Sequence, residues 1–218
     1  MSTAKPRLYK GSLFVLEGID GSGKTTVCDA VERRLTSLSY SVVRLREPTN
    51  ESPWGREIRK RSPRGELTPE EELELFIKDR DWHIANKILP SLTAGKVVIM
   101  DRYFFATGAY QSWSTGLSWR EILRRNRSDI NAPEPDIVFI LDTTAENGLS
   151  RVLGSRAEKN LQFEQLDRLV KVRQAYLEMA QSDSGNFMVI DAGQPLKDVI
   201  EQVYEAIHTY LTDTTDMQ

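Results

Sequence analysis

The sequence contains a single cysteine, Cys28, and no long apolar run. One cysteine excludes an internal disulfide framework and a metal site built from several thiolates. The longest unbroken apolar run, residues 137–141, is far shorter than the ~20 residues that a membrane helix requires. Residues 1–10 are polar and lack the apolar stretch of a signal peptide. These absences predict a cytoplasmic protein that does not enter a membrane.

The sequence also lacks a large excess of either positive or negative charge. Lysine and arginine number 29 and aspartate and glutamate 32, which gives a net charge of −3. This balance argues against a broad basic surface for a nucleic acid polymer. No repeat and no Gly/Ser/Pro-rich linker divides the 218 residues, a length at which α/β chains often fold as one unit. We predict one domain with a core over about 11–211 and a loose polar tail over 212–218.

Short apolar runs rich in β-branched residues alternate with longer stretches of helical period. Most of the runs lack polar alternation, as expected for strands covered on both faces. The pattern predicts an α/β fold, a five-stranded parallel sheet with helices on both faces. Capping-box sequences at Thr68 and Ser118 mark the starts of two helices. The predicted strands are 13–17, 41–46, 96–101, 136–142 and 187–191.

The most specific motif follows the first predicted strand and opens a helix. It matches G-x-x-x-x-G-K-[ST] and reads Gly18-Ile19-Asp20-Gly21-Ser22-Gly23-Lys24-Thr25. Its glycines let backbone N–H groups wrap phosphates, and the helix N-terminus adds positive charge. The lysine at the end reaches the β- and γ-phosphates, and the following hydroxyl ligates Mg²⁺. The motif predicts binding of a nucleoside triphosphate. Because the loop holds no arginine, a phosphotransferase would need a further cation from elsewhere.

A second group of residues is expected at the carboxyl edge of the sheet, where ligands bind in open parallel sheets. Asp101 could hold Mg²⁺ or its water and Arg102 a phosphate, although the two could also form a structural pair. Phe76 and Arg80 share one helix face and could hold a base and its phosphate, or be a core Phe beside a solvated Arg. Arg46 ends the second strand and is either a ligand or a surface charge.

Six short strings in the same order resemble the thymidylate (dTMP) kinase family of P-loop nucleoside monophosphate kinases, over about residues 13–210. They are residues 16–26, Arg46-Glu47-Pro48, Leu75-Phe76 with Arg80, Asp101-Arg102-Tyr103 with Ala109-Tyr110-Gln111, 135–142, and Ile190-Asp191-Ala192. The resemblance implies a P-loop NTPase fold with a short helical lid over about 151–164. It also implies Mg²⁺-dependent transfer of the γ-phosphoryl of ATP to dTMP, giving dTDP, and a homodimer.

The resemblance also implies a role for each matching residue. Residues 18–26, ending in Thr26, and Ala192 would bind ATP, with Thr25 and Asp101 at the metal. The catalytic residues would be Lys24, Asp101, Arg102, Arg151 and Arg156. On the acceptor side, Phe76 would stack on thymine and Arg80 would reach the base or the monophosphate. Thr107 would bond the pyrimidine edge, and Tyr110 would lie under the sugar. Arg46 and Arg102 would bind the 5′-phosphate, and Asp20 would position the sugar-phosphate.

The lid arginines answer the charge deficit of the loop. Arg156 is the candidate for the transferring phosphate and Arg151 for the donor phosphates, and Gly154-Ser155 offers backbone freedom for closure. Two segments depart from the family pattern: residues 49–55 replace Gly-Gly-Thr, and Leu161-Gln162 replaces an Asp-Arg pair. A kinase for another pyrimidine monophosphate or a deoxynucleoside is the alternative enzyme, and a P-loop nucleotide switch is the alternative without catalysis.

Overall fold

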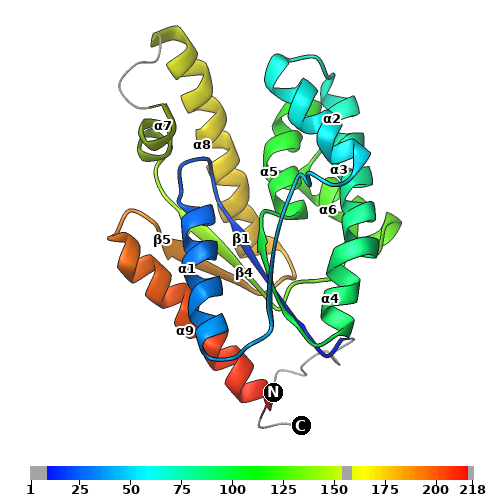
Figure 1. Ribbon diagram of the computed structural model, residues 1–218. Coiled ribbons are helices and arrows are strands. Elements are labelled where there is room, and N and C mark those ends of the chain that lie inside the picture. The colour runs from blue at the N-terminus through cyan, green and yellow to red at the C-terminus, as the bar shows by residue number, and fades with distance from the viewer. Residues whose placement is uncertain (1–8, 154–158, 216–218) are drawn as a thin grey trace.

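The computed structural model describes residues 9–153 and 159–215, in which five strands form one parallel sheet in the order β2-β3-β1-β4-β5 (Figure 1). Each strand lies within one residue of its predicted bounds, so the predicted sheet is confirmed. The strands are β1 (Ser12–Glu17), β2 (Val42–Arg46), β3 (Val97–Asp101), β4 (Ile137–Asp142) and β5 (Phe187–Asp191).

The helices of the described ranges cover both faces of this sheet. They are α1 (Lys24–Ser37), α2 (Pro53–Arg61), α3 (Pro69–His83), α4 (Leu89–Thr93), α5 (Phe104–Thr115), α6 (Trp119–Asp129), α7 (Ala145–Leu153), α8 (Lys159–Ser182) and α9 (Leu196–Thr215), with a 3-10 turn η1 (Ser62–Arg64) and a π-helical turn η2 (Ile84–Ile88). Nowhere in the described parts of the chain is a helix long and apolar enough to span a membrane.

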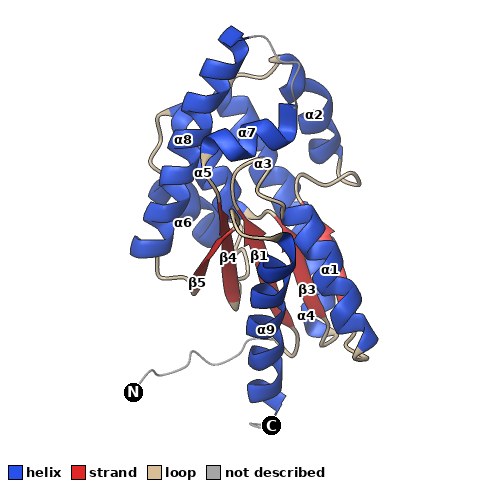
Figure 2. Ribbon diagram, turned by 90° about the vertical axis from the view of Figure 1, so that its left-hand side faces the viewer, coloured by secondary structure: helices blue, strands red, loops and turns tan. Residues whose placement is uncertain are grey.

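Alternation along the strands divides the core into two layers. Leu13 and Val15 of β1 face α4, α5 and α8, whereas Phe14 and Leu16 face α1 and α9. Figure 2 shows α1 and α9 on one side of the sheet and α5, α6 and α8 on the other. Because all four strand pairings are parallel, the carboxyl ends of the five strands lie at one edge of the sheet.

Burial of the strands depends on their place in the sheet. The three central strands are almost fully buried, as predicted. The prediction of full burial is wrong for β2 and β5, because each lies at an edge with one neighbouring strand. On β5, Met188 and Val189 are 40% and 48% exposed.

Capping sequences set two of the helix starts. At α3 the box is complete, since the Thr68 hydroxyl accepts from the Glu71 N–H and the Glu71 carboxylate accepts from the Thr68 N–H. At α6 only the first half forms: Ser118 accepts from the Glu121 N–H, but the Glu121 carboxylate instead binds Arg124. The second capping box is therefore only half confirmed.

The predicted loose tail over 212–218 is wrong in its first part, because α9 continues to Thr215. Leu211 is 7% exposed and packs on the layer under α9, which holds the last turns against the core. The hydroxyls of Thr212 and Thr214 donate to carbonyls four residues earlier and do not interrupt the helix. Residues 216–218 lie outside the described residues.

Candidate active site

The loop after β1 takes the shape that its glycines require. Gly18, Gly21 and Gly23 have φ angles of 141°, 79° and 97°, which side chains of L-residues rarely adopt. The ammonium of Lys24 donates to the carbonyls of Gly18 and Ile19 at 3.0 and 2.8 Å. Burial, followed by repulsion from Arg102, lowers the pKa of Lys24 to about 7. A bound phosphate would offer this amine the negative charge that it lacks here.

Helix α7 packs directly on this loop through two glycines. A Cβ on Gly21 would lie 2.1 Å from the Gly148 carbonyl oxygen, and one on Gly148 would lie 2.6 Å from the Asp20 carbonyl oxygen. The close approach lets Arg151 of α7 donate to the carbonyls of Gly21 and Ala192, both at 3.2 Å. Arg151 therefore joins the phosphate loop to the turn after β5, the two segments predicted to hold ATP. Sequence reasoning missed Gly148, because a single glycine inside a helix signals no particular partner.

The two predicted metal ligands lie side by side. The hydroxyl of Thr25 donates to Oδ2 of Asp101 at 2.6 Å. A hydroxyl and a carboxylate beside a phosphate loop are the hard oxygen ligands that Mg²⁺ accepts, directly or through its waters, so these residues fit the ion. Arg46 lies 3.8 Å from the same Asp101 oxygen. In this structure Arg46 thus lies beside Asp101 and does not line the acceptor cavity described next.

A cavity of about 210 Å³ opens beside the loop, between α3 and α5. Six of the seven residues predicted to bind the acceptor line it, all except Arg46. These six are Asp20, Phe76, Arg80, Arg102, Thr107 and Tyr110; further lining residues include Glu47, Ser62, Glu72, Gln111 and Arg168. A larger cavity of about 440 Å³ lies between α7 and α8 and contains no residue of the predicted site.

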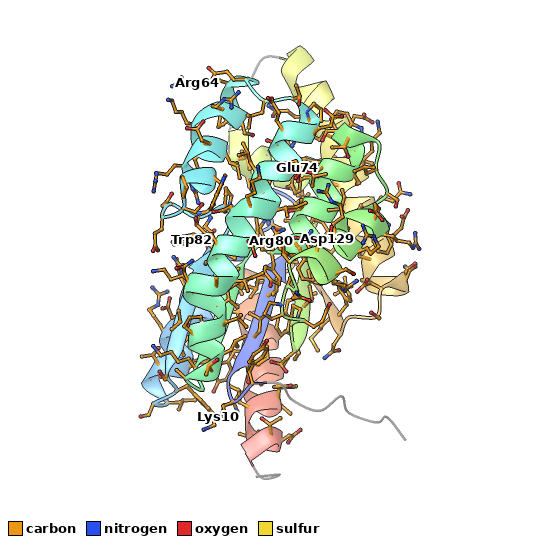
Figure 3. All side chains as sticks on the ribbon, turned by 90° about the vertical axis from the view of Figure 1, so that its right-hand side faces the viewer. Lys10, Arg64, Glu74, Arg80, Trp82 and Asp129 are labelled. Atoms are coloured by element: carbon orange, nitrogen blue, oxygen red, sulfur yellow. The ribbon has the colours of Figure 1, made fainter. Side chains whose placement is uncertain are left out.

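One end of the small cavity is formed by an aromatic side chain and a buried ion pair. Phe76 is half-buried and lines the cavity, so it is not the core residue of the alternative interpretation. Arg80 is fully buried near the middle of the molecule (Figure 3) and its guanidinium binds Glu47, Thr107 and Asn126. The alternative interpretation, a solvated Arg80, is therefore wrong. Glu47 neutralises the charge of Arg80 within this pair, and the Arg80 guanidinium donates to the Thr107 hydroxyl at 3.0 Å.

The other end carries a cation held over an aromatic ring. Arg102 forms an ion pair with Asp20, and its guanidinium lies 5.1 Å from the centre of the Tyr110 ring. Burial favours the protonated form of Asp20, but Arg102 and then Lys24 outweigh it and hold its pKa below the usual value. Arg102 has a φ of 71°, and its N–H donates to the Leu16 carbonyl at 3.1 Å. This backbone turn directs Arg102 toward the loop.

Asp79 holds the unusual segment 49–55, which sequence reasoning could not place. Its carboxylate accepts from the N–H and the hydroxyl of Thr49, at 2.8 and 2.6 Å, and from the hydroxyl of Ser52. Ser52 also caps α2 by accepting from the Gly55 N–H. Buried hydrogen bonds to a carboxylate of α3 thus fix the backbone of the segment 49–55.

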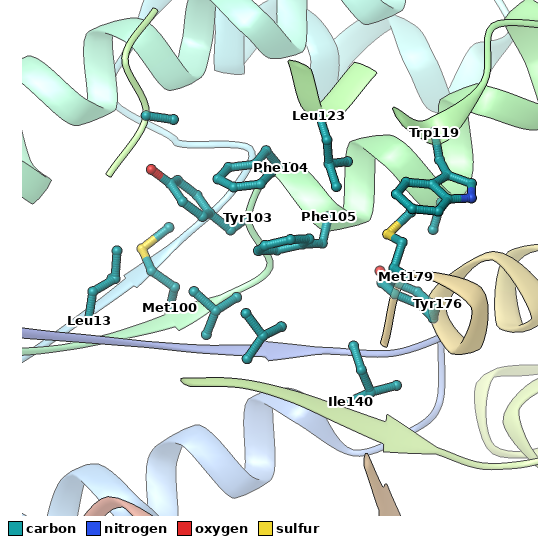
Figure 4. Close-up of a cluster of buried hydrophobic side chains, with 14 of the residues drawn as sticks. Leu13, Met100, Tyr103, Phe104, Phe105, Trp119, Leu123, Ile140, Tyr176 and Met179 are labelled. Atoms are coloured by element: carbon teal, nitrogen blue, oxygen red, sulfur yellow. The ribbon is translucent and has the colours of Figure 1, made fainter. Parts of the chain in front are cut away.

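Glu17, the last residue of β1, is a second residue that sequence reasoning missed. Its Oε1 accepts from the N–H groups of Tyr103 and Ala106 at 2.7 and 3.1 Å, at the start of α5, where Tyr103 supplies no side-chain cap. Its Oε2 accepts from the Tyr176 hydroxyl of α8 at 2.9 Å. Figure 4 shows Tyr103 and Tyr176 at opposite ends of the aromatic cluster between α5 and the sheet. One carboxylate therefore ties β1 to α5 and α8.

Burial raises the pKa of Glu17 from 4.5 to about 7, against the opposing charges of Arg102 and Lys24. The folded state then binds this proton more tightly than the unfolded state, so Glu17 makes stability fall as pH rises from about 4.5 to about 7. The full effect on the free energy of unfolding is about 3 kcal/mol. Glu17→Gln keeps an acceptor for both N–H groups but cannot ionise. Urea unfolding between pH 5 and 7.5 should give a flatter stability profile for this variant; equal slopes would contradict the assignment.

Comparison with known protein families shows to which family this chain belongs. The model described as "Thymidylate kinase" matches residues 16–203. The chain belongs to the thymidylate kinase family. It is 42% identical over 199 residues to the "Probable thymidylate kinase" of Archaeoglobus fulgidus, covering 91% of this chain and 96% of that protein. It is 38% identical over 203 residues to the "Thymidylate kinase" of Xanthomonas euvesicatoria pv. vesicatoria, covering 93% and 86%.

The part of the predicted lid that follows α7 is not described. Arg156 and the Gly154-Ser155 pair lie outside the described residues, so the role predicted for Arg156 stays a prediction. The described flanks are α7, which carries Arg151, and α8, which begins at Lys159. Membership of the family agrees with the fold and with the order of motifs that first indicated it.

Proposed function

We propose that this member of the thymidylate kinase family transfers the γ-phosphoryl of ATP to dTMP, giving ADP and dTDP. The observation that carries the proposal is the adjacency of two sites: a phosphate loop and an acceptor cavity that share Asp20. Asp20 belongs to the loop by sequence and lines the cavity by position. A nucleotide switch would need only the first of these sites.

Transfer between two bound nucleotides needs positioning and charge more than covalent help from the protein. Lys24 would leave its two carbonyl partners for the β- and γ-phosphates. Arg151, already between the loop and Ala192, would hold the donor on its other side. The acceptor phosphate, held at the Arg102 end, would face the loop, and Arg156 is our candidate for the transferring group. Mg²⁺ beside Thr25 and Asp101 would neutralise phosphate charge.

The other end of the cavity supports a pyrimidine base. Phe76 offers an aromatic face. Arg80, paired with Glu47, donates a hydrogen bond to the Thr107 hydroxyl at 3.0 Å and so fixes its position. A cavity of about 210 Å³ has room for a small ring, and Tyr110 would lie under the sugar, where a 2′-hydroxyl would crowd it. This arrangement supports dTMP over ribonucleotides.

Phe76→Ala should weaken dTMP binding by ~1–3 kcal/mol, the scale of base stacking on an aromatic side chain. The ATP KM should change little, because Phe76 lines only the acceptor cavity. Steady-state kinetics with each substrate varied in turn measure both constants. A parallel rise in both would indicate that the substitution loosens α3 instead of removing a stacking contact.

The direct test is a screen of nucleoside monophosphates and deoxynucleosides for ATP-dependent product formation, followed by chromatography. We expect dTDP from dTMP as the fastest reaction, abolished by removal of Mg²⁺. A faster reaction with another monophosphate or a deoxynucleoside would assign the enzyme to that acceptor. ATP binding without turnover of any acceptor would favour the switch.

We further propose a homodimer in the cytoplasm, by analogy with the family. Membership of the thymidylate kinase family supports this proposal. Sedimentation of the purified chain at micromolar concentration should give about twice the mass of 24.9 kDa. A monomer at that concentration would contradict the dimer and leave the chemistry of each active site unchanged.

A further inference from the structure

Helix α8 presents one cation to the acceptor cavity that the predicted site did not include. Arg168 lines this cavity together with Arg102 and Tyr110. Its guanidinium lies 5.4 Å from the centre of the Tyr110 ring, close to the 5.1 Å of Arg102. Two guanidinium groups, from different elements, therefore approach one tyrosine at the end of the cavity next to Asp20.

The packing of α8 explains this position. Val172 and Tyr176 follow Arg168 at intervals of four residues and are buried, at 0% and 1% exposure. Side chains four apart share one face of a helix, so Arg168, itself exposed, lies on the same face as these two buried residues, one turn further toward the cavity. The bond from the Tyr176 hydroxyl to Glu17 anchors the stripe against β1.

Charge pairing distinguishes Arg168 from the other cations of the cavity. The charged lining residues are three carboxylates and three guanidiniums: Asp20, Glu47, Glu72, Arg80, Arg102 and Arg168. Arg80 pairs with Glu47 and Arg102 pairs with Asp20. Within the described residues, Arg168 has no carboxylate at salt-bridge distance, although its charge helps, after Arg102 and Lys24, to keep the pKa of Asp20 low.

A phosphate monoester carries nearly two negative charges at neutral pH, since its second pKa is about 6. The Arg102–Asp20 pair alone brings no net charge to meet it. A second guanidinium at the same end supplies the missing positive charge and further N–H donors.

We propose that Arg168 is an acceptor-binding residue that contacts the 5′-phosphate end of the nucleoside monophosphate, opposite Arg102. The inference rests on the proposed function, because it takes the occupant of the cavity to be a monophosphate. It adds a cation from α8 to the acceptor site, beyond Arg80 and Arg102.

The test compares calorimetric binding of dTMP and of thymidine, which lacks the phosphate, to the parent chain and to Arg168→Ala. We expect dTMP to bind about ten- to hundredfold more weakly to the variant, as for loss of a charged hydrogen bond, and thymidine to bind within about twofold. Arg168→Lys should recover part of the loss. Lys171→Ala, on the same helix and paired with Asp167 outside the cavity, is the matched control and should bind dTMP like the parent.

Unchanged dTMP affinity in Arg168→Ala would overturn the inference. An equal loss for thymidine and dTMP would also overturn it, because the residue would then shape the cavity without contacting phosphate. A dTMP kinase assay of the parent chain separates the two proposals. If the parent phosphorylates dTMP while Arg168→Ala binds dTMP normally, only the inference fails; if the parent phosphorylates no monophosphate, the proposed function fails.

Discussion

Replacement of Lys24 by alanine is expected to reduce phosphoryl transfer at least about a thousandfold. The residue supplies the one side-chain cation of the loop over residues 18–25, and charge stabilisation of the transferring group dominates this chemistry. Among the described residues its ammonium binds uncharged oxygens alone, the carbonyls of Gly18 and Ile19 and the hydroxyl of Ser22. Its amine is thus available to a ligand at the cost of three neutral hydrogen bonds.

The thermal stability of Lys24→Ala should stay close to that of the parent, because burial disfavours the charged ammonium in the ligand-free protein. Added ATP should raise the melting temperature of the parent and not of the variant. Lys24→Met, of similar length without charge, separates lost charge from lost volume. A folded Lys24→Ala chain with turnover within tenfold of the parent would show that the lysine is not catalytic.

The sheet could be predicted from the sequence because buried strands and the phosphate loop each require particular residues at neighbouring positions. Each strand is a short apolar run, and the phosphate loop needs its glycines at fixed positions, so both are visible without the structure. The two edge strands were predicted as fully buried since the composition of a strand does not tell which strands have one neighbour. The helical end of α9 was missed because polar threonines satisfy their hydroxyls within the helix.

The acceptor residues were predicted from motifs, but the partners of those residues were not. Arg80 illustrates the difference: its spacing from Phe76 placed it on the cavity, whereas its burial against Glu47 and Asn126 depends on segments 33 and 46 residues away. Glu17, Asp79 and Arg168 act through similarly distant contacts. Long-range pairing of this kind has no signature in a single sequence, since each partner alone is an ordinary charged residue.

Arg102→Ala is expected to give the second largest loss, about 10²–10³-fold in kcat/KM for dTMP. The substitution removes the guanidinium that lies over Tyr110 and leaves Asp20 without its ion-pair partner. An unpaired carboxylate at the phosphate end would then repel the acceptor. The ATP KM should rise much less, because Arg102 lines the acceptor cavity.

The backbone at this position provides the control. Arg102 has a φ of 71°, a conformation that costs alanine about as much as arginine and glycine little. Arg102→Gly should therefore be more stable than Arg102→Ala by up to about 1–2 kcal/mol, the cost of the left-handed conformation, while both show the same loss of activity. Equal catalytic losses in two variants of different stability would assign the effect to the guanidinium. If Arg102→Gly recovered activity together with stability, the residue would act on the fold of the turn after β3 and not on the acceptor phosphate.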